Sequence, residues 1–150
     1  MARALRVDKF TIAALAATLD LLEDAGWAKS RLPVLRALET PPEELARRAA
    51  SLADELRRTT DLEVREVGTT SEVGGGAVPA EGLPTTAVAL RHEAHSAVEL
   101  AAEMRRLSVP VVGRIAEGEV LLDPRSLDPA EDAECARVLA ERFRGGRGGG

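Results

Sequence analysis

Helix-start signals constrain the fold of this chain more than any other feature of its sequence. Thr40-Pro41-Pro42-Glu43 and Ser96-Ala97-Val98-Glu99 have the spacing of a capping box, in which the first and last side chains bind backbone N–H groups of the first helical turn. Proline at the first helical position strengthens the first signal, and Asp128-Pro129-Ala130-Glu131 is predicted to cap the last helix. Thr40, Ser96 and Asp128 are therefore predicted as helix N-caps.

A longer helix is predicted near the beginning of the chain, over residues 8–23. Asp8 is a good N-cap, and Asp24-Ala25-Gly26 ends the helix. Apolar residues at helical spacing form one stripe along it: Ile12, Leu15, Leu19 and Leu22. No strand precedes this helix in the sequence, so we expect it to pack on a partner domain outside the chain. Leu32-Pro33-Val34-Leu35 is expected to be a short connector, because proline disfavours a helical residue before it.

The strand signals are short and lie on both sides of the second capping box. Strands are predicted over residues 62–67, 85–90, 109–115 and 119–122, and Glu117-Gly118 joins the last two as a hairpin. Strands connected partly by hairpins and partly by helices are typical of an α+β layer. The sequence therefore predicts a mixed or antiparallel sheet with helices packed on one face. Residues 1–144 are expected to form one small domain, and residues 145–150 a disordered Arg/Gly tail.

Composition and the rarer residue types argue against several classes of function. A net charge of −5 and only two Phe and one Trp do not suit sequence-independent nucleic-acid binding. The single cysteine, Cys135, is predicted to be a small buried residue. His92 and His95 lie three residues apart in a predicted loop, and two histidines alone rarely suffice to bind a metal ion, so a metal site is not expected. No membrane segment or secretory signal is recognised, and we expect a cytoplasmic protein with no membrane partner.

Gly74-Gly75-Gly76 is a candidate site because three residues without Cβ allow positive φ and a close approach by a ligand or another chain. No Gly-Lys-Ser/Thr closes the run, and no G-x-G-x-x-G spacing is present, so it is neither a phosphate loop nor a dinucleotide fingerprint. A flexible surface loop is the alternative interpretation.

Several short motifs follow one another along nearly the whole chain, from Arg3 to about the end of the last predicted helix. They are Arg3-Ala4-Leu5-Arg6-Val7-Asp8-Lys9, Leu32-Pro33-Val34-Leu35-Arg36, Val73-Gly74-Gly75-Gly76, Leu83-Pro84, Val112-Gly113-Arg114-Ile115 and Leu121-Leu122-Asp123-Pro124-Arg125. In this order and spacing they resemble the C-terminal portion of bacterial selenocysteine synthase, the L-seryl-tRNA(Sec) selenium transferase. The resemblance implies the small C-terminal domain of an aspartate-aminotransferase-like fold. It also implies a pyridoxal 5′-phosphate enzyme that works as a ring-shaped homo-oligomer.

The resemblance assigns roles to particular residues of this chain. The family converts seryl-tRNA(Sec) to selenocysteyl-tRNA(Sec) with selenophosphate, and Arg3 and Arg6 match arginines that hold this anionic donor. Arg114 matches a position where this fold class often grips an anionic group, which suits the forked donors of a guanidinium. Gly74-Gly75-Gly76 matches a loop that faces the active site. From spacing alone, Arg3 and Arg6 also fit a basic terminus and Arg114 an outward-facing strand residue.

The resemblance also implies what this chain lacks. The family's Schiff-base lysine and its tRNA-binding domain lie upstream of the matching segment, and we expect neither Lys9 nor Lys29 to replace that lysine. No catalytic residue is therefore predicted here, and the chain is expected to be inactive alone and to need the remaining domains of the enzyme as partners. Ala77 and Ala80 replace a serine and a glycine of the family's glycine loop, a departure that affects any polar contact there. The alternative function is a non-catalytic ligand-binding or dimerisation module.

Overall fold

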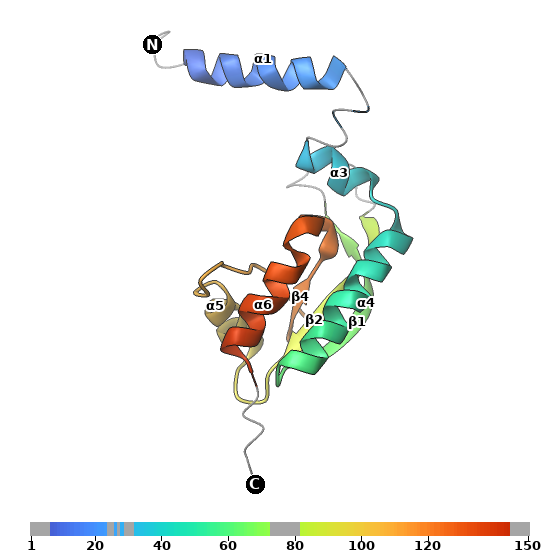
Figure 1. Cartoon of the computed structure of the whole chain (residues 1–150), viewed down its shortest axis with the longest axis vertical. Coiled ribbons are helices and arrows are strands. Elements are labelled where there is room, and N and C mark those ends of the chain that lie inside the picture. Colours follow the sequence, from blue (N-terminus) through green and yellow to red (C-terminus); the bar gives the residue numbers. More distant parts are fainter. Residues whose placement is uncertain (1–6, 24–25, 27, 29–31, 73–81, 145–150) are drawn as a thin grey trace. The chain divides into compact units, whose positions relative to one another are not determined.

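The computed structural model describes residues 7–23, 26, 28, 32–72 and 82–144. Contacts along the chain divide it into two compact units, residues 1–39 and 40–150. The first unit contains helices α1 (Lys9–Glu23) and α3 (Pro33–Glu39). In the second unit, the elements follow one another along the chain (Figure 1): α4 (Pro42–Thr59), β1 (Glu63–Ser71), β2 (Leu83–Arg91), α5 (Ala97–Met104), β3 (Arg114–Ala116), β4 (Glu119–Leu122), the 3-10 turns η1 (Pro124–Ser126) and η2 (Pro129–Glu131), and α6 (Asp132–Arg142). Residues 145–150, predicted as a disordered tail, lie outside the described residues.

The second unit is organised on an antiparallel sheet with the strand order β1-β2-β4-β3. The long strands β1 and β2 pair along their whole length, from Glu63↔Arg91 to Ser71↔Leu83. The shorter β4 pairs with β2 on one side and with β3 on the other. The predicted α+β class is confirmed, and every strand pair in the sheet is antiparallel.

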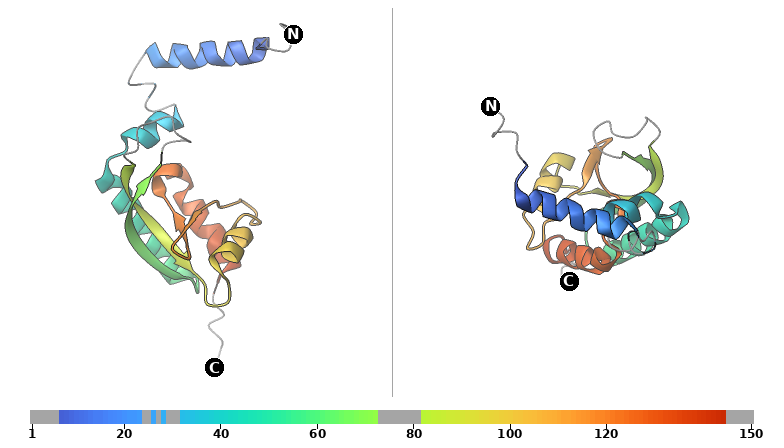
Figure 2. Two further views of the ribbon diagram at one scale, coloured as in Figure 1. Left: turned by 180° about the vertical axis from the view of Figure 1, so that it is seen from behind. Right: turned by 90° about the horizontal axis from the view of Figure 1, so that it is seen from above.

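Helices α4, α5 and α6 cover one face of this sheet (Figures 1 and 2). Alternate residues of β2 and β4 contribute to the core on this face: Val88, Leu90, Val120 and Leu122. They are packed with Leu56 of α4, Met104 of α5 and Leu139 of α6, all three of which have no exposed surface. Burying one such side chain stabilises a fold by about 1.5–3 kcal/mol, so this layer is the main source of stability in the unit. Within the described residues, no helix has both the length and the apolar content needed to span a bilayer.

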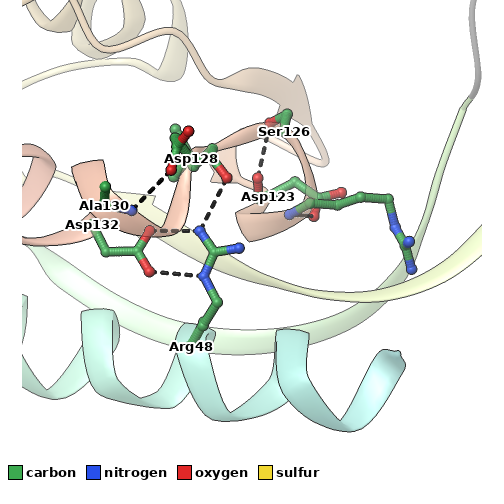
Figure 3. Close-up of polar contacts among 8 residues, drawn as sticks. Arg48, Asp123, Ser126, Asp128, Ala130 and Asp132 are labelled. Atoms are coloured by element: carbon green, nitrogen blue, oxygen red, sulfur yellow. Dashed lines mark hydrogen bonds and ion pairs between the residues drawn. The ribbon is translucent and has the colours of Figure 1, made fainter. Parts of the chain in front are cut away.

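A bidentate ion pair joins α4 to the start of α6 (Figure 3). Arg48 on α4 donates from Nε and Nη2 to the two carboxylate oxygens of Asp132, at 2.8 and 2.7 Å. Nη2 also donates to the Leu127 carbonyl at 3.1 Å. The Arg48 side chain is only 13% exposed, so two parallel charge-assisted bonds hold the helices in a fixed orientation largely shielded from water.

The start of α4 differs from the prediction. Its N-cap is Pro41, with φ −62° and ψ 145° and no side-chain capping bond, so the prediction of Thr40 as N-cap is wrong. The reason is Pro42, because the residue before a proline is sterically driven out of the helical region. Pro41 therefore stays extended, and Pro42 takes the first helical position, where a missing N–H is tolerated.

Residues 32–35 were predicted to be a connector, but the structure has a helix there, again because of a proline. Pro33 is instead the first residue of α3, the same favourable position that Pro42 occupies in α4. Of the strand predicted over residues 109–115, only its C-terminal end is strand, in β3. Pro110 has no N–H to offer a ladder, and the Val111 N–H donates to the Met104 carbonyl at 3.0 Å.

The cap predicted at Asp128 is present but belongs to a different element. Asp128 Oδ1 accepts a hydrogen bond from the Ala130 N–H at 3.0 Å and caps the turn η2 (Figure 3). Helix α6 follows directly, with Glu131 as its N-cap. The predicted start of the last helix is thus a short 3-10 turn that leads into it.

The capping box at Ser96 is confirmed. Ser96 Oγ accepts from the Glu99 N–H at 3.3 Å, and the Glu99 carboxylate accepts from the Ser96 N–H at 2.8 Å. Asp8 caps α1 in a similar way, accepting from the N–H groups of Phe10 and Thr11. The predicted hairpin is also present, because Glu117 and Gly118 have φ of 51° and 78° between the paired strands β3 and β4.

Replacing Ser96 with alanine should lower the free energy of unfolding by about 1 kcal/mol, because the first turn of α5 loses its side-chain acceptor. The hydrogen bond from Ser96 lowers the pKa of Glu99 below the ordinary glutamate value of 4.5. Stability from a carboxylate with a lowered pKa is present above the unfolded pKa and is lost as pH falls through the folded one. The difference between wild type and Ser96→Ala in urea denaturation should therefore shrink as the pH is lowered below 4.5. Ser51→Ala, on the exposed face of α4, is the control and should not be destabilising.

Candidate functional site

The face of the sheet opposite the helices carries a mixture of small and charged side chains. At its centre Ala87, Ala89 and Leu121 form a separate buried cluster. Because β2 contributes only methyl groups here, the middle of the face leaves room for long side chains that cross it from neighbouring strands. Two arginines do so, Arg65 from β1 and Arg114 from β3.

Arg65 crosses the sheet to β4. Its Nε donates to Glu119 Oε1 at 3.0 Å, and its Nη2 donates to Glu119 Oε2. The Glu119 side chain is only 6% exposed and that of Arg65 is 53% exposed. Donating hydrogen bonds to Glu119 raises the pKa of the Arg65 guanidinium, which therefore keeps its positive charge beside the buried carboxylate.

Arg114 extends from the opposite edge of the sheet. Its Nη2 donates to Thr69 Oγ1 at 2.7 Å and to the Thr70 carbonyl at 3.3 Å. Since β3 and β1 are the two edge strands, the face must be curved enough for one arginine to reach from edge to edge. Both contacts use a single nitrogen of an exposed guanidinium. Within the described residues, these side-chain hydrogen bonds of Arg114 use neither Nε nor Nη1.

A carboxylate joins three segments at the end of the sheet near Thr69. Asp123 directly follows β4, and its carboxylate accepts hydrogen bonds from Ser71 Oγ, from Thr85 Oγ1 at 2.8 Å and from the Arg125 N–H at 3.0 Å. Ser71 is the last residue of β1, and Thr85 lies near the start of β2. Asp123 therefore fixes the distance between the two strands where the chain leaves β1 and enters β2.

Arg125 extends this polar cluster into the interior. It is only 8% exposed, and its Nη2 donates to the Pro84 carbonyl at 2.6 Å. Its Nη1 donates to the Thr40 carbonyl at 3.3 Å. Arg125 thus links the start of β2 to the residues before α4, and Asp123 and Arg125 together hold this end of the sheet.

Gly113 determines where Arg114 lies. A Cβ added at Gly113 would lie 2.6 Å from Val120 Cγ1 and 2.9 Å from the Leu121 carbonyl oxygen. Val120 belongs to the buried core and Leu121 contributes backbone here, so neither can move away easily. The segment before β3 can lie this close to β4 only because residue 113 has no side chain.

The remaining predicted site residues have different outcomes. Arg3, Arg6 and Gly74-Gly75-Gly76 lie outside the described residues. Of the predicted anion-binding residues only Arg114 is described. It lies on the face of the sheet opposite helices α4, α5 and α6, called the open face below, rather than in the helix-covered core. Sequence reasoning missed the polar partners on this face. Alternation along β1 could have placed Thr69 and Ser71 together, but not opposite Asp123.

His92 and His95 bind each other. Their Nδ1 atoms are 2.8 Å apart, and His92 Nδ1 also accepts from the Ala94 N–H at 3.0 Å. A backbone N–H can only donate, so His92 Nδ1 is the acceptor in the bond with Ala94. No group of three or more His, Cys, Asp or Glu side chains suited to a metal ion occurs among the described residues. Cys135 is buried as predicted, and burial raises the pKa of its thiol to about 12.

Comparisons with known proteins agree with the motif resemblance. The family model of L-seryl-tRNA selenium transferase matches residues 1–128. The chain is 46% identical to the L-seryl-tRNA(Sec) selenium transferase of Geobacter sulfurreducens over 83% of its length, which is 28% of that protein. For the enzyme of Nitratidesulfovibrio vulgaris the identity is 43% over 93% of the chain and 30% of the relative. For that of Moorella thermoacetica it is 39% over 100% of the chain and 32% of the relative.

The match covers the described elements that form the open face. Residues 1–128 include β1 to β4, Gly113, Arg114 and the Asp123 cluster. The chain spans between 28% and 32% of the length of the curated relatives it matches. With a family model over most of its length and this level of identity, the chain belongs to the L-seryl-tRNA(Sec) selenium transferase family.

Proposed function

We propose that this chain supplies the small C-terminal part of an L-seryl-tRNA(Sec) selenium transferase, which converts seryl-tRNA(Sec) to selenocysteyl-tRNA(Sec) with selenophosphate. The single observation that carries this proposal is the family match over residues 1–128, supported by 39–46% identity to enzymes of that name. Because the chain spans less than a third of those relatives, its partners are the tRNA-binding and cofactor-binding domains of the same enzyme, assembled as a homo-oligomer.

Arg114 is the residue that we propose to bind an anionic group of a substrate. Thr69 and Thr70 hold its guanidinium through one nitrogen, which fixes its position on the open face. The two other nitrogens form a planar pair of donors that suits two oxygens of a phosphate. Ala87, Ala89 and Leu121 form the apolar centre of the same face. Arg3 and Arg6 are proposed to bind the selenium donor, as their motif implies.

Pyridoxal 5′-phosphate does not fit the described residues as a covalent site. Lys9 is the only lysine among them, and it lies in the first turn of α1 at an exposed position, with Nζ 5.5 Å from the centre of the Phe10 ring. The described residues do not enclose this exposed amine, and a Schiff-base lysine needs the cofactor's ring and phosphate held nearby. We therefore propose that the cofactor binds to the remaining part of the enzyme. The chain alone is then inactive.

A chimaera tests the proposed function. In it, this chain replaces the matching segment of the Geobacter sulfurreducens enzyme, and conversion of seryl-tRNA(Sec) is measured. We expect the chimaera to be active and the chain alone to be inactive. Arg114→Gln should lower kcat/KM by about 10- to 100-fold, because it removes charge-assisted hydrogen bonds to an anion. Arg47→Gln, an exposed arginine on α4, is the control and should leave activity unchanged.

Different outcomes would contradict different parts of the proposal. An inactive but folded chimaera, beside an active Geobacter sulfurreducens enzyme, would argue against the proposed function. Equal activities for the wild-type and Arg114→Gln chimaeras would show that Arg114 does not bind the anionic group. Turnover by the chain alone would show that it contains a complete active site.

A further inference from the structure

Helix α1 exposes most of its apolar side chains. None of its residues from Lys9 to Glu23 is buried. The large apolar side chains on it are between 46% and 76% exposed: Phe10, Ile12, Leu15, Leu19 and Leu22. A soluble chain rarely presents so many large apolar groups together unless another surface covers them.

The apolar residues are not confined to one stripe. At about 100° per residue, Ile12, Leu15, Leu19 and Leu22 lie on one side of the helix. The opposite side is also apolar and carries Phe10, Ala14, Ala17 and Leu21. The charged residues Lys9, Asp20 and Glu23 fall within one sector of roughly 60° at this spacing. A helix that is apolar on nearly all sides is typical of the interior of a larger protein.

The distribution of apolar residues around α1 distinguishes between the surfaces that could cover this helix. Pairing of two identical helices needs only one apolar stripe, so a second copy of α1 would leave the opposite side in water. About 70% of the length of each relative lies outside the part that this chain matches, which is enough sequence to surround a helix on several sides. The family match begins before α1 and includes it, so the helix is part of the shared fold.

We propose that α1 is an interface helix, buried on both of its apolar sides by the portion of the transferase polypeptide that lies outside this chain. The inference rests on the proposed function for the identity of that partner. Only the sector of Lys9, Asp20 and Glu23 remains in contact with water. A helix of this length is marginal by itself in water, so docking also stabilises the helix.

Substitutions to glutamate on the different sides of α1 test the proposal. Leu19→Glu and Ala17→Glu place a charge on the two apolar sides, whereas Ala16→Glu places it between Lys9, Asp20 and Glu23 and is the matched control. The chain is co-expressed with a tagged segment of the Geobacter sulfurreducens enzyme that contains its unmatched part. We expect the wild type and Ala16→Glu to co-purify with it, and Leu19→Glu and Ala17→Glu to be retained at least tenfold less. Thermal unfolding of residues 40–150 should be the same in all variants.

Hydrogen exchange of α1 provides a second measurement that does not depend on turnover. Its amides should exchange rapidly in the 150-residue chain and slowly in the chimaera. An active chimaera in which the α1 amides exchange rapidly would contradict the proposed α1 interface but not the proposed function. An inactive chimaera in which these amides are protected would contradict the proposed function but not the interface. Failure of the wild-type chain to co-purify would overturn the proposal. So would a dimer of the chain alone that Leu19→Glu dissociates, or binding of α1 to phosphatidylcholine vesicles.

Discussion

Replacing Gly113 with alanine is expected to lower the free energy of unfolding of residues 40–150 by about 2 kcal/mol, within the range measured for overpacked cores. The added methyl group would overlap Val120 Cγ1, at 2.6 Å, and the Leu121 carbonyl oxygen, at 2.9 Å. Val120 has no exposed surface and contributes to the core under α5, so relief requires β3 to move away from β4. Chemical denaturation monitored by far-UV circular dichroism measures the loss.

Gly68→Ala is the matched control for this prediction. Gly68 lies in β1, and a Cβ added there meets no heavy atom within 4 Å. The same substitution should be neutral or slightly stabilising at this position, because alanine restricts the unfolded chain more than glycine does. Equal effects of the two substitutions would show that the close approach at Gly113 does not exist in solution.

The same substitution has a consequence for function. Gly113 precedes Arg114, so a shift of β3 moves the guanidinium away from Thr69 and Thr70. In the active chimaera, Gly113→Ala should therefore lower kcat/KM even at temperatures where the protein remains folded. The Gly68→Ala control should retain full activity.

Local signals in the sequence predicted most of the elements of the second unit. The capping box of Ser96 depends on residues three positions apart, and the Glu117-Gly118 turn depends on two neighbouring residues, so neither needs tertiary information. The error at Thr40 was also local. A second proline at position 42 acts on the residue before it, and this steric effect outweighs the capping pattern.

The site required information that a single sequence does not carry. Arg114 binds Thr69 across 45 positions of sequence, and Ser71 binds Asp123 across 52. Both contacts depend on the strand order β1-β2-β4-β3 and on its curvature. Alternation along a strand can show which of its residues share a face, but not which strands are neighbours. Arg114 was identified by its motif, and its partners became apparent only in the folded sheet.

Covalent attachment of the cofactor should differ completely between the isolated chain and the chimaera. We expect that this chain alone, incubated with pyridoxal 5′-phosphate and reduced with borohydride, carries no stoichiometric label on any one lysine. Lys9 lies in the first turn of α1 and is exposed, so the described residues do not enclose its amine. Lys29, the other lysine of the sequence, lies outside the described residues.

Intact mass followed by peptide mapping provides the measurement, and the chimaera is the positive control. The chimaera should gain one cofactor per chain, at a lysine contributed by the Geobacter sulfurreducens segment. Lys9→Arg should leave the low background labelling of the isolated chain almost unchanged, because a non-specific reaction is distributed over both lysines and the terminal amine. Full labelling of Lys9 or Lys29 in the isolated chain would contradict the assignment of the cofactor site to the rest of the enzyme. A Schiff base needs an amine held beside a bound ring and phosphate, so such labelling would require a cofactor pocket within these 150 residues.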